Sequence, residues 1–259
     1  ENKDQIIRFY SDFYLSTSQI DKSCEIFDFV ELVSNDYLNY FKMYCLIKQN
    51  KRDQAQLLFD LTSELGSIND FFKKKFNILM GYEKEDELIS DKNILFFHLS
   101  HITNKNFFYE PNTDTPKFIW NYLSAVNLLT KTDLVDIKNI DQVKLIEKAT
   151  NEEIYEEKDL LSLYKRYQFD INQLINALEN YKALPDYEAR ALLYQRLLLA
   201  VDTEQKLIFS SKLNELFKDS NLSKAFDFEL SVILSNIDVD QVPSNFTTFY
   251  NVHKEPESI

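Results

Sequence analysis

Residues 53–81 read DQAQLLFDLTSELGSINDFFKKKFNILMG, and this stretch shows the pattern that the rest of the chain repeats. Two segments with apolar residues at helical spacing are each followed by a glycine, first Gly66 and then Gly81. Glycine adopts the left-handed conformation that ends many helices, so the stretch predicts two helices stopped by glycines. The residues predicted to face the core are Leu57, Leu58 and Leu61 in the first helix, and Phe72, Phe76, Leu79 and Met80 in the second.

The same helical period runs along most of the chain, and no alternating pattern typical of a β-strand interrupts it. One predicted core stripe near the N-terminus contains Ile6, Phe9, Tyr10, Phe13 and Tyr14. Helix starts recur in pairs at roughly 32–34 residues, a period typical of stacked helical hairpins. The predicted fold is therefore all-α, an α-solenoid of stacked antiparallel helix pairs with about 12 to 14 helices.

A weakly periodic segment at 130–141 divides this pattern into two parts. We expect an N-terminal helical repeat block at 1–129 and a C-terminal block at 130–259, joined as one continuous superhelix. Just before the boundary, Thr115 and Pro116 predict the start of a helix, with Thr115 as N-cap and Pro116 in the first turn.

Two short motifs resemble the tetratricopeptide repeat family, which places a small residue and, four positions later, an aromatic residue on the second helix of each hairpin. Ala55 and Phe59 fit this spacing, and so do Ala177 and Tyr181. The large first-helix residues of that family have counterparts in Leu38, Phe41 and Cys45. The chain departs from the pattern at Lys42, where the family has glycine. The resemblance implies a degenerate superhelix, similar also to the helical region of soluble lytic transglycosylases, and it carries no catalytic residue.

Composition excludes several classes of function. With two glycines in 259 residues, the chain cannot form the glycine-rich loops that hold nucleotides. The net charge of −13 repels nucleic acid and anionic membranes, so we expect neither as a partner. No apolar run approaches the ~20 residues needed to span a bilayer, so membrane insertion is not expected.

Cysteine and histidine are scarce, and neither forms a recognisable metal or catalytic motif. Cys24 and Cys45 lie in apolar helical patterns and are interpreted as buried thiols, with a disulfide between neighbouring helices as the alternative. His98 and His101 share a helical face, with Asp91 or Glu87 as a possible third ligand, but zinc catalysis needs three firm ligands and a base. We therefore expect no metal, no cofactor and no catalytic residue, and interpret the histidines as contacting carbonyls at a helix end.

Tyrosines and polar loop residues are the best candidates for binding a partner. The loop at 103–114 and tyrosines on the concave face of a solenoid are predicted to meet a protein or peptide. The acidic chain favours a basic partner. The predicted partner-binding residues are Tyr109, Asn112, Asp114, Tyr187 and Tyr194.

Three functions remain open at this point. The leading hypothesis is a non-catalytic scaffold or peptide-binding α-solenoid. The alternatives are a helical accessory region of a larger enzyme, such as a cell-wall lytic transglycosylase, and a metal-binding helical protein centred on His98 and His101. The sequence does not fix the oligomeric state or the compartment, and the bacterial cytoplasm and periplasm both fit.

Overall fold

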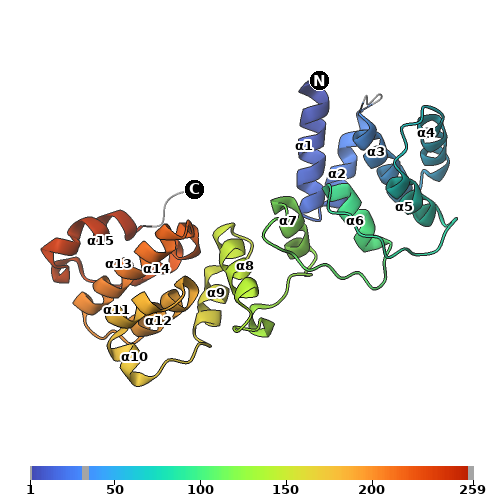
Figure 1. Cartoon of the computed structure of the whole chain (residues 1–259). Helices are drawn as coiled ribbons and strands as arrows, with labels where there is room; N and C mark the ends of the chain where they lie inside the picture. The colour runs from blue at the N-terminus through green and yellow to red at the C-terminus, as the bar shows by residue number, and fades with distance from the viewer. Residues whose placement is uncertain (1, 31–34, 256–259) are drawn as a thin grey trace. The chain divides into compact units, whose positions relative to one another are not determined.

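The protein is all-α in the computed structural model, which describes residues 2–30 and 35–255, apart from the side chain of Asn2 (Figure 1). The structure is 67% helical, and no β-strand lies among the residues that it describes. Fifteen α-helices and five short 3₁₀ helices lie within these residues. The predicted class is confirmed, although the α-helices outnumber the expected 12 to 14. None of the described helices is both long and apolar enough to pass through a lipid bilayer.

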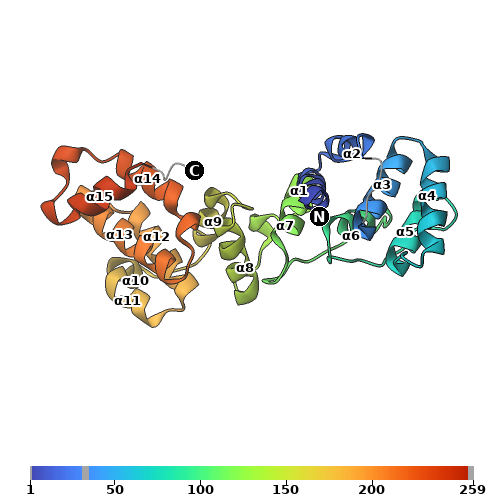
Figure 2. The ribbon, with the colours of Figure 1, turned by 90° about the horizontal axis from the view of Figure 1, so that it is seen from above.

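The chain divides into two compact units, Glu1–Leu129 and Thr130–Ile259, called unit 1 and unit 2 below. In unit 1, α1 packs against α2, and α3 packs against α4 (Figures 1 and 2). These are the helix pairs that the repeat pattern predicts. The helices of unit 1 are α1 (Asn2–Ser16), α2 (Ile20–Asp28), α3 (Asp36–Lys48), α4 (Arg52–Glu64), α5 (Asp70–Met80), α6 (Ile94–Ile102) and α7 (Lys117–Ala125).

Both glycines end helices, as predicted. Gly66 follows α4 with φ of 70°, and Gly81 caps α5 with φ of 85°. The Gly81 N–H donates to the carbonyl of Ile78, which closes the last turn of α5. A residue with a Cβ would be strained at either position, because both lie in the left-handed region.

The start of α7 differs from the prediction by one residue. Pro116 is the N-cap, and its carbonyl accepts the first helical hydrogen bond from Ile119. Thr115 does not cap the helix. Its hydroxyl accepts a hydrogen bond from the Asn112 N–H at 2.9 Å, because the loop before α7 folds back on itself.

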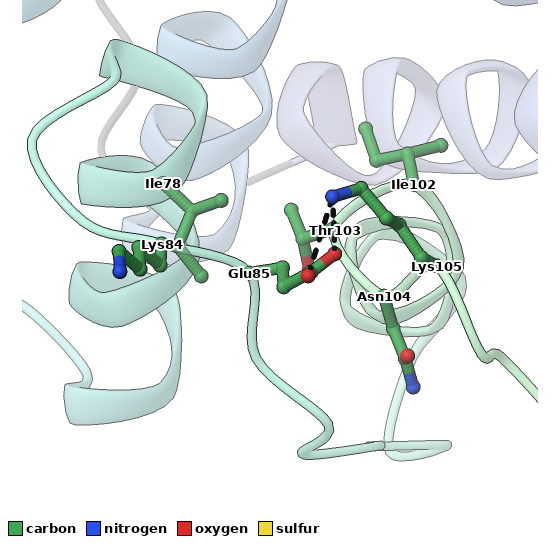
Figure 3. A pocket seen from close by; sticks show the side chains of 7 residues that line it. All are labelled: Ile78, Lys84, Glu85, Ile102, Thr103, Asn104 and Lys105. Carbon is green, nitrogen blue, oxygen red and sulfur yellow. Dashed lines mark hydrogen bonds and ion pairs between the residues drawn. The ribbon is translucent and has the colours of Figure 1, made fainter.

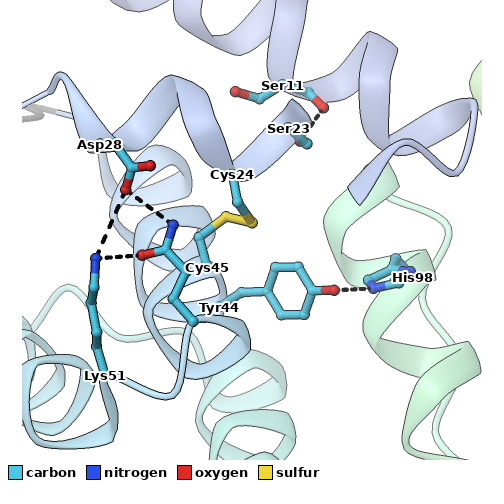
Figure 4. The surroundings of a disulfide bond; sticks show 9 residues. Ser11, Ser23, Cys24, Asp28, Tyr44, Cys45, Lys51 and His98 are labelled. Carbon is cyan, nitrogen blue, oxygen red and sulfur yellow. Dashed lines mark hydrogen bonds and ion pairs between the residues drawn. A yellow bond between two sulfur atoms is a disulfide. The ribbon is translucent and has the colours of Figure 1, made fainter. Parts of the chain in front are cut away.

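Cys24 on α2 and Cys45 on α3 form a disulfide, so the interpretation of two free thiols is wrong (Figure 4). The two Cα atoms lie 5.2 Å apart, within the range that a disulfide requires. The packing of α2 against α3 brings the cysteines together across 21 residues of sequence.

The largest correction concerns α1. The predicted core stripe faces solvent: Ile6, Phe9, Tyr10 and Phe13 are 48% to 65% exposed. The buried side chains of α1 are instead Ile7, Ser11, Leu15 and Ser16. Small serines let the backbones of α1 and α2 approach, and Ser23 donates to the Ser11 carbonyl at 2.8 Å (Figure 4).

The same reversal occurs on α4. Leu57 and Leu61 are exposed and Leu58 is half-buried, although all three were predicted to face the core. The core side of α4 is Ala55, Phe59 and Thr62. Phe59 stacks on Phe76 of α5 with ring centroids 4.3 Å apart, which fixes this side of the helix against the core.

Unit 2 has its own hydrophobic core and more broken helices. The segment at 170–184 is divided at Asn176 into two short α-helices and a 3₁₀ turn. The α-helices of unit 2 are α8 (Ile140–Asn151), α9 (Glu157–Tyr164), α10 (Ile171–Ile175), α11 (Ala177–Asn180), α12 (Asp186–Leu198), α13 (Thr203–Asp219), α14 (Asp227–Ser235) and α15 (Thr247–His253). Its 3₁₀ helices are η1 (Thr132–Leu134), η2 (Tyr181–Ala183), η3 (Ser223–Ala225), η4 (Val239–Gln241) and η5 (Ser244–Phe246).

A buried ion pair ties together the helices of unit 2. Arg190 of α12 donates to both carboxylate oxygens of Glu147 on α8, at 3.0 and 2.8 Å. Tyr164 of α9 also donates to Glu147, and Arg190 reaches the Ser220 hydroxyl at 2.7 Å. Side chains of the surrounding helices thus donate hydrogen bonds to the Glu147 carboxylate, which is satisfied without water.

Exposed helix faces and a buried histidine network

His98 lies in the core of unit 1, where it joins two tyrosines. Its Nε2 is 2.6 Å from the Tyr44 hydroxyl of α3 (Figure 4). Its Nδ1 is 2.8 Å from the Tyr122 hydroxyl of α7. His101 Nδ1 also lies 2.8 Å from the Tyr122 hydroxyl. The histidines therefore contact tyrosine hydroxyls, and the expectation that they contact helix-end carbonyls is wrong.

The network is fully hydrogen-bonded when both imidazoles are neutral. Tyr44 can donate to His98 Nε2, His98 Nδ1–H to the Tyr122 oxygen, and Tyr122 to His101. Burial lowers the pKa of His98 to about 3, and the nearby His101 and Lys48 act in the same direction. Burial also lowers the pKa of His101 and raises that of Tyr122. The network is thus a neutral polar link that holds α3, α6 and α7 together.

Metal ligation finds no support around these histidines. Among the described residues, no group of three histidine, cysteine or carboxylate side chains is placed to hold a metal ion. Asp91, one of the two suggested carboxylate ligands, instead accepts a hydrogen bond from the Tyr109 hydroxyl at 2.9 Å.

The predicted recognition loop has an ordered arrangement. Asn112 and Asp114 are exposed, and the Asn112 side chain accepts from the Asp114 N–H at 2.8 Å. Tyr109 is half-buried, with its ring edge-on to Phe97 at 4.8 Å between centroids. Asn112 and Asp114 therefore remain available to a partner, while Tyr109 mainly fastens the loop to α6.

Two other predicted partner residues are not on the surface. Tyr187 and Tyr194 of α12 are only 5% and 2% exposed and belong to the core of unit 2. Burial raises the pKa of Tyr194, whose hydroxyl reaches Glu229 at 3.4 Å. The expectation that these tyrosines lie on an exposed face is wrong, because packing withdraws them from solvent.

A pocket of about 520 Å³ opens beside the loop between α5 and α6 (Figure 3). Across this pocket, the Lys105 ammonium group forms an ion pair with the Glu85 carboxylate at 3.2 Å (Figure 3). Asp86 anchors one wall through the ammonium groups of Lys74 and Lys75, at 2.9 and 3.1 Å. Burial raises the pKa of Asp86, but these two cations outweigh it and hold the pKa below its ordinary value. The pocket side chains are Ile78, Lys84, Glu85, Ile102, Thr103, Asn104 and Lys105.

The exposed row on α1, which we call the α1 face, is the most conspicuous surface feature of unit 1. It contains Ile6, Phe9, Tyr10 and Phe13, at the i, i+3, i+4 and i+7 spacing of one helix face. Phe9 meets Tyr10 edge-on with centroids 5.4 Å apart, so the rings form a continuous surface. Taking ~200 Å² for each large side chain and half of it exposed, the face presents roughly 400 Å². Apolar patches of this size on soluble proteins often mark interaction sites.

The sequence contains the signal for this face but does not give its direction. Its periodic row was identified correctly as one helix face, and only the three-dimensional packing shows that it points outward.

The chain matches no protein-family model, and no curated protein or solved structure matches it significantly.

Proposed function

We propose that this chain is a non-catalytic protein-binding module that uses the α1 face to hold an amphipathic helix of a partner protein. The observation that carries the proposal is the exposure of four large apolar side chains on one side of α1. From residue 6 to residue 13 the row is ~10 Å long, which matches about two turns of a partner helix. Its area of roughly 400 Å² is about half of what one partner contributes to a standard interface. These dimensions favour a bound helical segment over a large globular surface.

The helical scaffold supports the same proposal. We interpret the helix pairs α1–α2 and α3–α4 as degenerate tetratricopeptide-like repeats, in which Ala55 and Phe59 are both buried as that family requires. The second motif gives weaker support, since Ala177 is buried but Tyr181 lies in a 3₁₀ turn. Proteins of such architecture commonly bind peptides and partner helices.

The net charge suggests the kind of partner, and the disulfide suggests the compartment. The net charge of −13 favours a basic protein and disfavours nucleic acid, mainly through the rate of association. The disulfide between Cys24 and Cys45 supports an oxidising compartment, where such bonds form and persist. The periplasm, an extracellular space or a secretory lumen would each provide this condition.

Replacing Phe9 and Phe13 by serine should abolish partner binding. The double variant removes the two rings at the centre and end of the row, and substitutions at such exposed positions usually change stability by less than ~0.5 kcal/mol. We expect tagged wild-type chain to retain a specific protein from its native cells, and the variant to retain it at least tenfold less, as measured by quantitative mass spectrometry.

Ile171→Ser with Ile175→Ser provides a matched control. These two residues of α10 are 72% and 65% exposed, so the control removes comparable apolar surface from unit 2. It should retain the partner as the wild type does. The proposal fails if no retained protein depends on Phe9 and Phe13, or if light scattering shows that the only effect of the variant is loss of self-association.

A further inference from the structure

A second exposed row lies on α4, which occupies the opposite end of unit 1 from α1 (Figures 1 and 2). Leu57, Leu61 and Leu65 are 52% to 82% exposed. Their i, i+4, i+8 spacing places them along one side of the helix, and Leu65 continues the row as the C-cap residue. Three exposed leucines in line leave ~12 Å of apolar helix surface that no described residue of this chain covers.

Acidic side chains border this leucine row. Asp53, Asp60 and Glu64 are all exposed, and at 100° per residue they lie within about 60° of Leu57 around the helix axis. No ion pair joins these three carboxylates to another residue in the described ranges 2–30 and 35–255. Asp60 accepts a hydrogen bond from the Gln56 amide at 2.8 Å.

The basic residues at the start of α4 do not neutralise this acidic border. Lys51 donates to Gln49 at 2.7 Å and lies 4.0 Å from Asp28 on α2 (Figure 4). Arg52 donates to the carbonyl of Met80 at the end of α5, at 3.3 Å. Both cations are thus engaged on other sides of the helix, and the leucine row keeps a negatively charged edge.

We propose that this leucine row and its acidic border, together the α4 face, bind a basic amphipathic helix of a partner protein. Leucine, methionine or phenylalanine side chains of the bound helix would cover Leu57, Leu61 and Leu65, and removal of this apolar surface from water provides the affinity. Lysine or arginine beside them would meet Asp60 and Glu64, which select for charge and speed the encounter. A second copy of this chain would bring its own acidic row against the first, so self-pairing is disfavoured. This proposal does not depend on the α1 face.

The test uses two fluorescein-labelled peptides of 18 residues, added to the purified full-length chain. Both peptides have leucine at helical spacing, one with lysine and the other with glutamate at every polar position. We expect fluorescence anisotropy to show saturable binding of the lysine peptide and none of the glutamate peptide. Leu57→Ser with Leu61→Ser should weaken binding at least tenfold, and Asp60→Asn with Glu64→Gln should weaken it about tenfold at low salt and less at high salt.

Two controls separate this site from general attraction between opposite charges. Ile171→Ser with Ile175→Ser removes exposed apolar surface elsewhere, and Asp21→Asn with Glu25→Gln removes exposed charge elsewhere in unit 1, at the same spacing as Asp60 and Glu64. Both should bind the lysine peptide as the wild type does. Equal weakening by these controls and the α4 variants would overturn the proposal, and so would equal binding of both peptides. If the leucine variant loses its fold, judged by circular dichroism, the Asp60 and Glu64 variant alone decides the outcome.

Discussion

Replacing Arg190 by methionine is expected to lower the free energy of unfolding of unit 2 by about 3–5 kcal/mol. The substitution retains a long apolar stem but leaves the Glu147 carboxylate buried without its cation. Glu147 and Arg190 are each only 2% exposed, so water cannot replace the lost bidentate contact without opening the core. A buried charge without a partner is among the most destabilising defects that one substitution can create.

Thermal unfolding followed by far-ultraviolet circular dichroism would measure this effect. The single tryptophan, Trp120, lies in unit 1, so its fluorescence reports on that unit separately. We expect the Arg190→Met variant to lose the unit 2 transition at a lower temperature while the Trp120 transition stays in place.

An apolar triple variant provides the matched control. Glu147→Met, Arg190→Met and Tyr164→Phe together remove the charge, its partner and the tyrosine hydroxyl that donates to the carboxylate. Buried ion pairs replaced in this way are often neutral or stabilising, so the triple variant should recover most of the lost stability. If the Arg190→Met variant is as stable as the wild type, Glu147 is not buried with Arg190 in solution.

Unit 1 is expected to lose about 2 kcal/mol of stability between pH 7.5 and pH 5 through His98 alone. The pKa of His98 falls from 6.5 to about 3 on folding, so the unfolded state binds the proton first as the pH drops. The stability contributed by neutral His98 is therefore complete above pH 6.5 and declines continuously toward pH 3. Urea titrations followed by Trp120 fluorescence at both pH values would measure the loss.

The His98→Gln variant isolates this contribution. Glutamine keeps a polar side chain near Tyr44 but does not titrate, so the variant should be less stable at pH 7.5 and lose about 2 kcal/mol less than the wild type on acidification. His101→Gln should change the pH dependence to a smaller extent, because His101 is only partly buried. An unchanged pH dependence in the His98 variant would show that the histidine is already accessible to protons in the folded state.

Helix positions and helix ends could be predicted from the sequence because they depend on local signals. Gly66 and Gly81 stop helices through their own backbone freedom, and the 3.6-residue period is visible without tertiary context.

The direction of each helix face could not be predicted in the same way. Helix α1 has one side with Ile7 and Leu15 and another with Phe9 and Phe13, and apolar size favours the second as the core. Packing selects the first, because Ser11 allows the close approach of α2. The surface that we propose for binding was therefore mistaken for core.

Contacts between residues far apart in the sequence could likewise not be predicted from sequence patterns. His98 meets Tyr44 across 54 residues, and Cys24 meets Cys45 across 21. No local motif encodes either pair, so the histidines were interpreted as contacting carbonyls at a helix end and the cysteines as free thiols. Tyr187 and Tyr194 illustrate the opposite error, since an aromatic residue on a helix can serve the core or a partner equally well.

Site-specific photo-cross-linking from the α1 face would test the proposed function most directly. A benzophenone amino acid in place of Phe9 should yield one discrete adduct with a partner protein in native cells, and the adduct should disappear when Phe13 is changed to serine. The same photoreactive residue in place of Ile171 should not give that adduct. The account is contradicted if position 9 yields no adduct, or if positions 9 and 171 yield the same ones.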